Sequence, residues 1–304
     1  MKNITFTVFS DLHYDHIHDG YSRLQNFIDG VKNENLDFVI QLGDFAYPID
    51  ENSFLHEKIR ETGVPFYSVL GNHDTDSYSR DTVMRFLGMK SSYYSFSIGN
   101  VRFIVLDSCF INTENGCIPY LKRNYDKLND KYPYIPNDEI EWLKNELNSD
   151  RQYFVIFSHH SLENDFQKRG IFNRLEIQEI INEINETDKR VLLCMNGHDH
   201  GEHVEKIGKT YYYSLNSMSY IWVGPQYEHF DYSKETHAKY PYLKDLVLYE
   251  DGLYALVTIF EDGNFEIKGM EGAYDNVSPQ SLGIGDRWNG RNINPSVSSV
   301  VSKY

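Results

Sequence analysis

The sequence is poor in cysteine, in long apolar runs and in clustered positive charge. Its three cysteines, Cys109, Cys117 and Cys194, are too few for a disulfide framework and show no C-x-x-C spacing, which fits a reducing compartment. No stretch approaches the ~20 apolar residues of a membrane span, and the run Ile4–Phe9 is too short for a signal peptide. We therefore expect a cytoplasmic protein without a membrane partner, unless a native leader is missing from this chain.

Negative charge dominates the composition. The 304 residues include 45 acidic and 29 basic ones, which gives a formal net charge of −16. Proteins that bind nucleic-acid polymers present a basic face, and no run of Lys and Arg would form one here. A small phosphate compound stays possible as a ligand, because bound divalent cations invert the local field. The sequence does not define an oligomeric state.

Buried strands alternate with helices over the first two-thirds of the chain. Helical spacing of apolar residues is seen in Tyr21–Glu34, Asp138–Leu147 and Leu175–Ile184. This alternation is typical of an α/β layered fold. Six apolar runs have the length and composition of buried strands: Ile4–Phe9, Phe38–Leu42, Phe66–Leu70, Val101–Leu106, Tyr153–Phe157 and Val191–Met195.

The remaining segments predict further strands, an insertion and a tail. Glu261–Gly263 has the composition of a hairpin turn. The polar, tyrosine-rich stretch Ile111–Pro136 is long for a loop and is interpreted as an insertion near the functional site. We expect one domain over residues 1–275, including that insertion, and an extended C-terminal tail over 276–304. Four later runs read as strands: Tyr211–Leu215, Leu246–Tyr249, Tyr254–Phe260 and Asn264–Lys268.

Candidate metal ligands follow five of the six apolar runs of the first 200 residues. In open α/β sheets, ligands bind outside the carboxyl ends of the strands, so these side chains should converge. Asp, His and Asn donors without Cys suit manganese, iron or zinc. About seven donors are too many for one tetrahedral ion, but they can serve two ions that share a carboxylate. The motifs are Asp11-Leu12-His13, Gly43-Asp44, Gly71-Asn72-His73-Asp74, His159-His160 and Gly197-His198-Asp199-His200.

The order of these motifs resembles the calcineurin-like metallophosphoesterase family. The series D-x-H, G-D, G-N-H-D, H and G-H-x-H spans residues 4–200 of this chain. The resemblance implies an α/β fold, a four-layered α/β/β/α sandwich of two facing mixed sheets. A second β-rich group in residues 211–268 fits that expectation.

The resemblance also implies a role for each matching residue. A hydroxide shared by the two ions would attack phosphorus, and His73 would stabilise the transition state or protonate the leaving oxygen, with Asp74 orienting His73. The implied metal ligands are Asp11, His13 and His200 on the first ion, Asn72, His159 and His198 on the second, and Asp44 bridging both.

Two details depart from the simplest family pattern. Ser161 follows His159-His160 where relatives often have Pro, so the choice between the two histidines stays open, with His159 favoured. The series Gly43-Asp44-Phe45-Ala46-Tyr47 also resembles the purple acid phosphatases, in which that Tyr binds ferric iron. Because His13 should already fill that coordination position, we expect packing or substrate contact for Tyr47.

Several polar and aromatic residues near the motifs have two readings. The cluster Asp15, His16, His18 and Asp19 could touch substrate, but we expect a solvated loop. The many C-terminal tyrosines and tryptophans could pack the second sheet or stack on a base or sugar. Among the C-terminal segments, Asn216–Tyr220 is the one expected to reach the metals.

The sequence therefore predicts a dinuclear metal-dependent phosphoesterase that hydrolyses a small phosphodiester or phosphomonoester. A nucleotide pyrophosphatase or a cyclic-nucleotide phosphodiesterase is the alternative within the same class. The rival outside it is a non-catalytic, protein-binding scaffold on the same fold. Every ligand position is occupied and His73 is present, which favours the enzyme.

Overall fold

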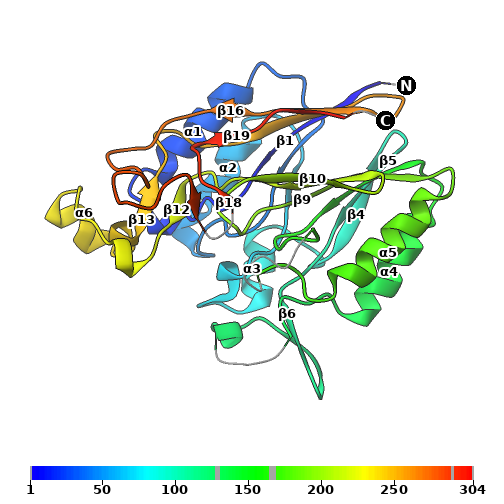
Figure 1. The fold of residues 1–304 in the computed structure, drawn as a ribbon, viewed down its shortest axis with the longest axis horizontal. Coiled ribbons are helices and arrows are strands. Elements are labelled where there is room, and N and C mark those ends of the chain that lie inside the picture. Colours follow the sequence, from blue (N-terminus) through cyan, green and yellow to red (C-terminus); the bar gives the residue numbers. More distant parts are fainter. Residues whose placement is uncertain (1, 127–130, 164–168, 289–290, 303–304) are drawn as a thin grey trace.

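Two six-stranded sheets face each other at the centre of the molecule (Figure 1). The computed structural model describes residues 2–126, 131–163, 169–288 and 291–302. The first sheet has the order β20-β15-β14-β1-β2-β3, and the second has the order β10-β11-β9-β8-β5-β4. Both are mixed. In the first sheet, parallel strands form one end and antiparallel strands the other. In the second sheet, a parallel centre is flanked by antiparallel strands.

All six predicted apolar runs form strands of these sheets. They are β1 (Ile4–Phe9), β2 (Phe38–Gln41), β3 (Phe66–Ser68), β5 (Val101–Val105), β8 (Tyr153–Phe157) and β9 (Arg190–Asn196). The other members are β4 (Tyr94–Ile98), β10 (His203–Ile207), β11 (Thr210–Ser214), β14 (Ala255–Ile259), β15 (Phe265–Lys268) and β20 (Val300–Val301). β1, β2 and β3 run parallel, as do β5, β8, β9 and β11.

An aromatic cluster fills the space between the two sheets. Phe6 of β1 and Phe38 of β2 stack with ring centroids 4.6 Å apart. Phe103 of β5, from the opposite sheet, meets Phe38 edge-on at 4.9 Å. All three side chains are fully buried. These contacts join the sheets directly and make the inter-sheet space the main core.

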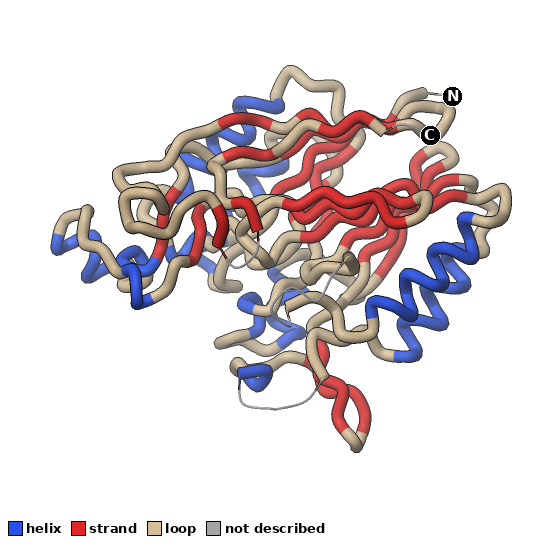
Figure 2. The backbone as a smooth tube through the Cα atoms, in the orientation of Figure 1, coloured by secondary structure: helices blue, strands red, loops and turns tan. Residues whose placement is uncertain are grey.

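Helices cover the outer faces of both sheets, which gives the expected four-layered α/β/β/α sandwich (Figure 2). The first sheet is covered by α1 (Gly20–Val31), α2 (Phe54–Arg60) and α3 (Arg80–Phe86). The second is covered by α4 (Asn137–Leu147) and α5 (Arg174–Asn185). The helical spacing of their apolar residues produces one buried stripe on each helix. Short 3-10 helices span Tyr14–His16, Asp50–Asn52, His73–Thr75, Asn124–Asp126, Pro225–Tyr227 and Leu243–Asp245.

The β-rich residues 211–268 contribute strands to both sheets. β11 joins the second sheet beside β9, whereas β14 and β15 join the first sheet beside β1. The predicted hairpin at Glu261–Gly263 is confirmed, because β14 and β15 pair antiparallel on either side of it. Between β11 and β14 in the sequence, β12 (Tyr220–Trp222) and β13 (Leu246–Leu248) form a separate pair, and α6 spans Lys234–Lys239.

The insertion and the C-terminal segment both contain short strand pairs. The insertion contains the hairpin of β6 (Phe110–Thr113) and β7 (Gly116–Pro119). Beyond residue 275, β17 (Arg287–Trp288) pairs with β18 (Arg291–Asn292), and β19 (Ser296–Val297) pairs with β16 (Met270–Glu271). The domain boundary at 275 stays a prediction. Among the described residues, no helix has both the length and the apolar character to cross a membrane.

Replacing Phe103 by Ala tests the inter-sheet core. The substitution leaves a cavity against Phe6, Phe38 and Phe96. We expect the free energy of unfolding to fall by about 3–5 kcal/mol, measured by denaturant titration. Phe230→Ala is the control, since that ring is 65% exposed, and its effect should stay within about 0.5 kcal/mol. Equal losses in both variants would contradict this assignment of the core.

Candidate metal centre

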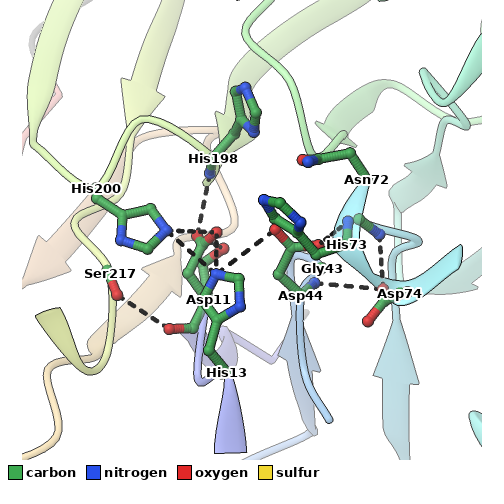
Figure 3. Close-up of polar contacts among 12 residues, drawn as sticks. Asp11, His13, Gly43, Asp44, Asn72, His73, Asp74, His198, His200 and Ser217 are labelled. Carbon is green, nitrogen blue, oxygen red and sulfur yellow. Dashed lines mark hydrogen bonds and ion pairs between the residues drawn. The ribbon is translucent and has the colours of Figure 1, made fainter. Parts of the chain in front are cut away.

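The five predicted motifs lie together at the carboxyl ends of β1, β2, β3, β8 and β9. Backbone hydrogen bonds tie the loops to one another. The Asp11 amide donates to Gly43 O at 3.1 Å, and the Gly197 amide donates to His159 O at 3.1 Å. Figure 3 shows most of the labelled side chains gathered around the carboxylates of Asp11 and Asp44. The convergence expected from strand topology is therefore present.

Several residues of the loops that carry the candidate ligands adopt the left-handed backbone conformation, which residues with a side chain usually avoid. Left-handed backbone is uncommon for residues other than glycine and costs of order 1–3 kcal/mol each. Such conformations cluster at functional sites because the surrounding structure holds them in place. Five predicted ligands have positive φ angles: Asp11 (54°), His13 (45°), Asp44 (54°), His198 (69°) and His200 (48°).

Asp11, His13 and His200 form one group of donors. The carbonyl oxygen of Tyr220 can only accept, so His200 Nδ1, 2.9 Å away, is the donor. In the neutral ring, the lone pair of His200 Nε2 then faces Asp11 Oδ1 at 3.3 Å and His13 Nε2 at 3.3 Å. Asp11 Oδ1 is buried and has no hydrogen-bond partner among the described residues. Such an array of acceptors calls for a cation.

Asn72, His159 and His198 form a second group. His159 Nδ1 donates to Leu42 O at 2.8 Å, which leaves Nε2 2.9 Å from Asn72 Oδ1 and 3.2 Å from His198 Nδ1. Burial lowers the pKa of His159, but the nearby negative charge of Asp44 outweighs it and raises the pKa to about 9. The second group therefore also favours positive charge at its centre.

His160 lies near the second donor group, but its Nδ1 atom contacts Ser108. Its ligand atom falls within 4.8 Å of those of His159 and His198. However, His160 Nδ1 hydrogen-bonds Ser108 Oγ at 2.7 Å. His159, in contrast, approaches both Asn72 and Asp44. The geometry agrees with the preference for His159, which stays a prediction.

Asp44 stands between the two groups. Its Oδ2 lies 3.6 Å from His13 Nε2 and 3.3 Å from His159 Nε2, while its Oδ1 accepts the His73 amide at 2.8 Å. Burial acts to raise the pKa of Asp44, but the charges of His159 and His73 outweigh burial and hold it well below its usual value. A buried, ionised carboxylate that touches both groups has the position of a bridging ligand. The nitrogen and oxygen donors, with no thiolate among them, fit manganese, iron or zinc.

Two glycines make room for these side chains. A Cβ at Gly43, whose φ is 109°, would lie 2.4 Å from His159 Nδ1. A Cβ at Gly197 would lie 1.8 Å from Ser10 Oγ and 2.5 Å from Asp11 Oδ2. The loops can therefore approach one another closely only where a side chain is absent.

The structure gives Asp74 a different role from the one expected. His73 Nδ1 pairs with Asp76 Oδ2 at 2.7 Å, whereas Asp74 accepts the amides of Gly71 at 2.7 Å and Phe45 at 3.1 Å. Asp74 thus joins the two loops by hydrogen bonds, and Asp76, not Asp74, contacts the His73 ring. Burial lowers the pKa of His73, but the negative charges around it outweigh this and raise the pKa above its usual value. The His73 side chain remains 34% exposed.

The insertion supplies further contacts to Asp76. Tyr125 Oη donates to Asp76 Oδ1 at 2.6 Å, and Arg123 Nε lies 3.5 Å from Asp76 Oδ2. Asn72 Nδ2 in turn reaches Tyr125 Oη at 3.4 Å. The expectation that the insertion lies near the site agrees with these contacts. The sequence pattern did not single out Asp76, Tyr125 or Arg123, because they belong to no recognisable motif.

The C-terminal segment also reaches the ligand loops. Arg291, only 3% exposed, pairs with Asp199 at 3.0 Å and with Glu163 at 3.2 Å. Asp199 sits between His198 and His200, so this buried ion pair braces the loop that carries these two candidate ligands. The sequence gives no sign of this contact, because Arg291 lies 92 residues from Asp199 and 128 residues from Glu163 along the chain.

A cavity of about 440 Å³ opens over the candidate ligands. His16 and Tyr47 line it, and Tyr47 Oη lies 3.1 Å from His16 Nε2. The expectation of a solvated loop is therefore wrong for His16. It is also wrong for Asp15, whose carboxylate accepts the Tyr47 amide. The segment Asn216–Tyr220 contacts the ligand loops, since Ser217 Oγ donates to Asp11 O at 2.9 Å.

Comparison with known proteins agrees with this geometry. The sequence model of the calcineurin-like phosphoesterase family matches residues 4–202, so the chain belongs to that family. No curated protein matches the chain.

Solved structures share the fold at low sequence identity. A dimetal phosphatase from Danio rerio is similar with a TM-score of 0.60 and 16% identity, over 89% of this chain and 96% of that one. GAP50, described as the anchor in the inner membrane complex of Plasmodium, gives 0.56 and 16% over 88% and 84%. The purple acid phosphatase PPD1 of yellow lupin gives 0.50 and 14% over 88% and 51%.

Asp76→Asn tests which carboxylate orients His73. Loss of the Asp76 charge should lower the pKa of His73 and the kcat for phosphate esters, removing part of the ~10²–10⁴-fold that a positioned acid contributes. Metal content and the unfolding midpoint should stay unchanged. The His73 pKa can be followed by NMR and kcat by phosphate release.

Asp74→Asn is the matched comparison. It should lower the unfolding midpoint, because Asp74 accepts the amides of Gly71, Asp44 and Phe45. An unshifted His73 pKa in Asp76→Asn, with a shift in Asp74→Asn, would restore the role first expected for Asp74.

Proposed function

We propose that this chain is a dinuclear metal-dependent phosphoesterase that hydrolyses a small phosphodiester or phosphomonoester. Members of its family act on phosphate esters and carry a pair of divalent metals, and the similar Danio rerio structure is described as a dimetal phosphatase. The observation that carries the proposal is the position of Asp44. One buried oxygen, Oδ2, reaches both the His13 and the His159 donor groups.

The described donors suit two ions. Asp11, His13 and His200 would hold the first, Asn72, His159 and His198 the second, and Asp44 both. When bound, such a pair supplies Lewis-acid polarisation of the phosphate and a hydroxide nucleophile at neutral pH.

Other residues of the chain act on the substrate and on the proton. His73, with Nδ1 on Asp76 and its ring open to the cavity, is oriented to give the Nε2 proton to the leaving oxygen or to stabilise the charge that develops there. Arg123 lines the same side of the cavity and adds positive charge beside Asp76. Asp74 keeps the loops of Asp44 and Asn72 in register.

A non-catalytic scaffold is the second candidate. The similar GAP50 structure is described as an anchor, so this fold is not restricted to enzymes. The complete donor set and the exposed, oriented His73 favour catalysis here. Nucleotide pyrophosphatase and cyclic-nucleotide phosphodiesterase activities are narrower versions of the same proposal.

The direct test is turnover of bis(p-nitrophenyl) phosphate and p-nitrophenyl phosphate after loading with Mn²⁺, Zn²⁺, Fe²⁺ or Co²⁺. We expect hydrolysis of at least one ester with at least one metal, and its loss on chelation. Absence of turnover under all these conditions would favour the scaffold.

Two substitutions separate catalysis from metal binding. His73→Ala should remove most turnover, a loss of ~10²–10⁴-fold, with metal content unchanged. Asp44→Ala should lose metal, because it removes the carboxylate shared by both donor groups. Elemental analysis and kcat measured on the same preparations check both expectations. Equal metal loss in the two variants would show that the role of His73 is wrong.

A further inference from the structure

The cavity over the metal ligands is larger than a phosphate group requires. Its volume of about 440 Å³ lies within the ~300–1,000 Å³ of pockets that bind small organic ligands. His13, Asp44, His198 and His200 line it on the side of the metal centre. The remaining lining must therefore meet the organic part of the ester, and its chemistry indicates which group that is.

Aromatic rings line the part of the cavity that is exposed to solvent. Trp222 is 38% exposed, although its β12 neighbours Tyr220 and Ile221 are buried. Tyr242 is 37% exposed, and its ring centroid lies 5.8 Å from that of Trp222. Rings that served only to pack the second sheet would be covered. These two keep part of their surface free beside the cavity.

The C-terminal segment holds this aromatic surface in place. Trp288 of β17 lines the same cavity and donates from Nε1 to the Trp222 carbonyl oxygen at 3.0 Å. β12 and β18 lie beside each other in Figure 1. The aromatic surface, defined here as Trp222, Tyr242 and Trp288, is therefore built from two distant parts of the chain and is fixed by a hydrogen bond.

Polar groups lie between the metal ligands and the aromatic surface. The His16 ring is 5.1 Å from His13 on one side and 4.7 Å from Tyr242 on the other. His16 Nε2 is 3.1 Å from Tyr47 Oη, and His16 Nδ1 is 3.3 Å from Tyr220 Oη. Moving away from the metals, the cavity thus presents charge, then hydroxyl and imidazole groups, then aromatic faces.

We propose that the substrate is a nucleoside phosphate ester. Its phosphate lies over the metal ligands, its sugar hydroxyls meet His16 and Tyr47, and its base stacks on the aromatic surface. Arg169, which also lines the cavity, adds positive charge that suits an anionic ligand in a protein of net charge −16. This proposal rests on the proposed phosphoesterase function and names its substrate class. Aliphatic phosphate esters offer nothing to stack on these rings.

The proposal is tested with matched esters that differ only in the base-bearing group. One pair is AMP and glycerol 3-phosphate, and the other pair consists of their methyl diesters. The Mn²⁺-loaded protein should hydrolyse the monoester pair or the diester pair. Within the pair that is hydrolysed, we expect kcat/KM to be at least tenfold higher for the nucleoside ester than for the glycerol ester. Similar values within both pairs would overturn the substrate class while leaving the phosphoesterase in place. Absence of all turnover would instead count against the proposed function.

Trp222→Leu separates stacking from a structural role. It should raise KM roughly 5- to 150-fold for the nucleoside ester, as expected for loss of base stacking, with kcat and the KM for the glycerol ester unchanged. Trp222→Phe keeps a ring and should retain most of the affinity. A parallel rise in KM for both esters would mean that Trp222 only supports the fold.

Binding can be read without turnover. The chain has three tryptophans, and Trp142 on α4 packs against Tyr93 and does not line the cavity. In Trp142→Phe, AMP should therefore quench the remaining fluorescence saturably, and glycerol 3-phosphate should not. Equal quenching by AMP and glycerol 3-phosphate, or quenching by neither, in Trp142→Phe would overturn the proposed stacking surface.

Discussion

Two buried carboxylates, Asp11 and Asp44, lie next to imidazole nitrogens whose lone pairs face them. The rest of the structure depends on holding these groups together. Both carboxylates are at most 3% exposed, and one oxygen of Asp11 has no hydrogen-bond partner among the described residues. Burying such groups costs several kcal/mol unless a positive charge compensates. Without metal, His159 can hold a proton for Asp44, which is why its pKa is raised. A pair of cations meets the same need for both groups.

The fold supplies this arrangement through its sheet topology. Parallel strands end at one edge of each sheet, and the facing sheets bring the loops after β1, β2 and β3 against those after β8 and β9. The aromatic core between the sheets sets their relative position, and the left-handed loop residues turn the side chains toward the common centre. Strain in these loops is acceptable because hydrogen bonds such as those of Asp74 hold them.

Much of this could be predicted from the sequence, because its signals are local. Apolar runs of strand length, helical periodicity and ligand motifs at strand ends each depend on a few adjacent residues. The parts that were missed depend on contacts that carry no recognisable sequence signal. Asp76 takes the role expected of Asp74 because the 3-10 turn at residues 73–75 places Asp76 beside the His73 ring. The assignment of β11, β14 and β15 to different sheets, and the pairing of Arg291 with Asp199, follow from tertiary packing that has no sequence periodicity.

We propose that the donors form one site for two ions, joined by Asp44. Anomalous X-ray scattering from a crystal of the Mn²⁺-loaded protein would locate these ions. We expect two metal peaks about 3.5–4 Å apart. One should lie among Asp11, His13 and His200, the other among Asn72, His159 and His198, with Asp44 Oδ2 between them. A single peak, or peaks outside these two groups, would contradict it.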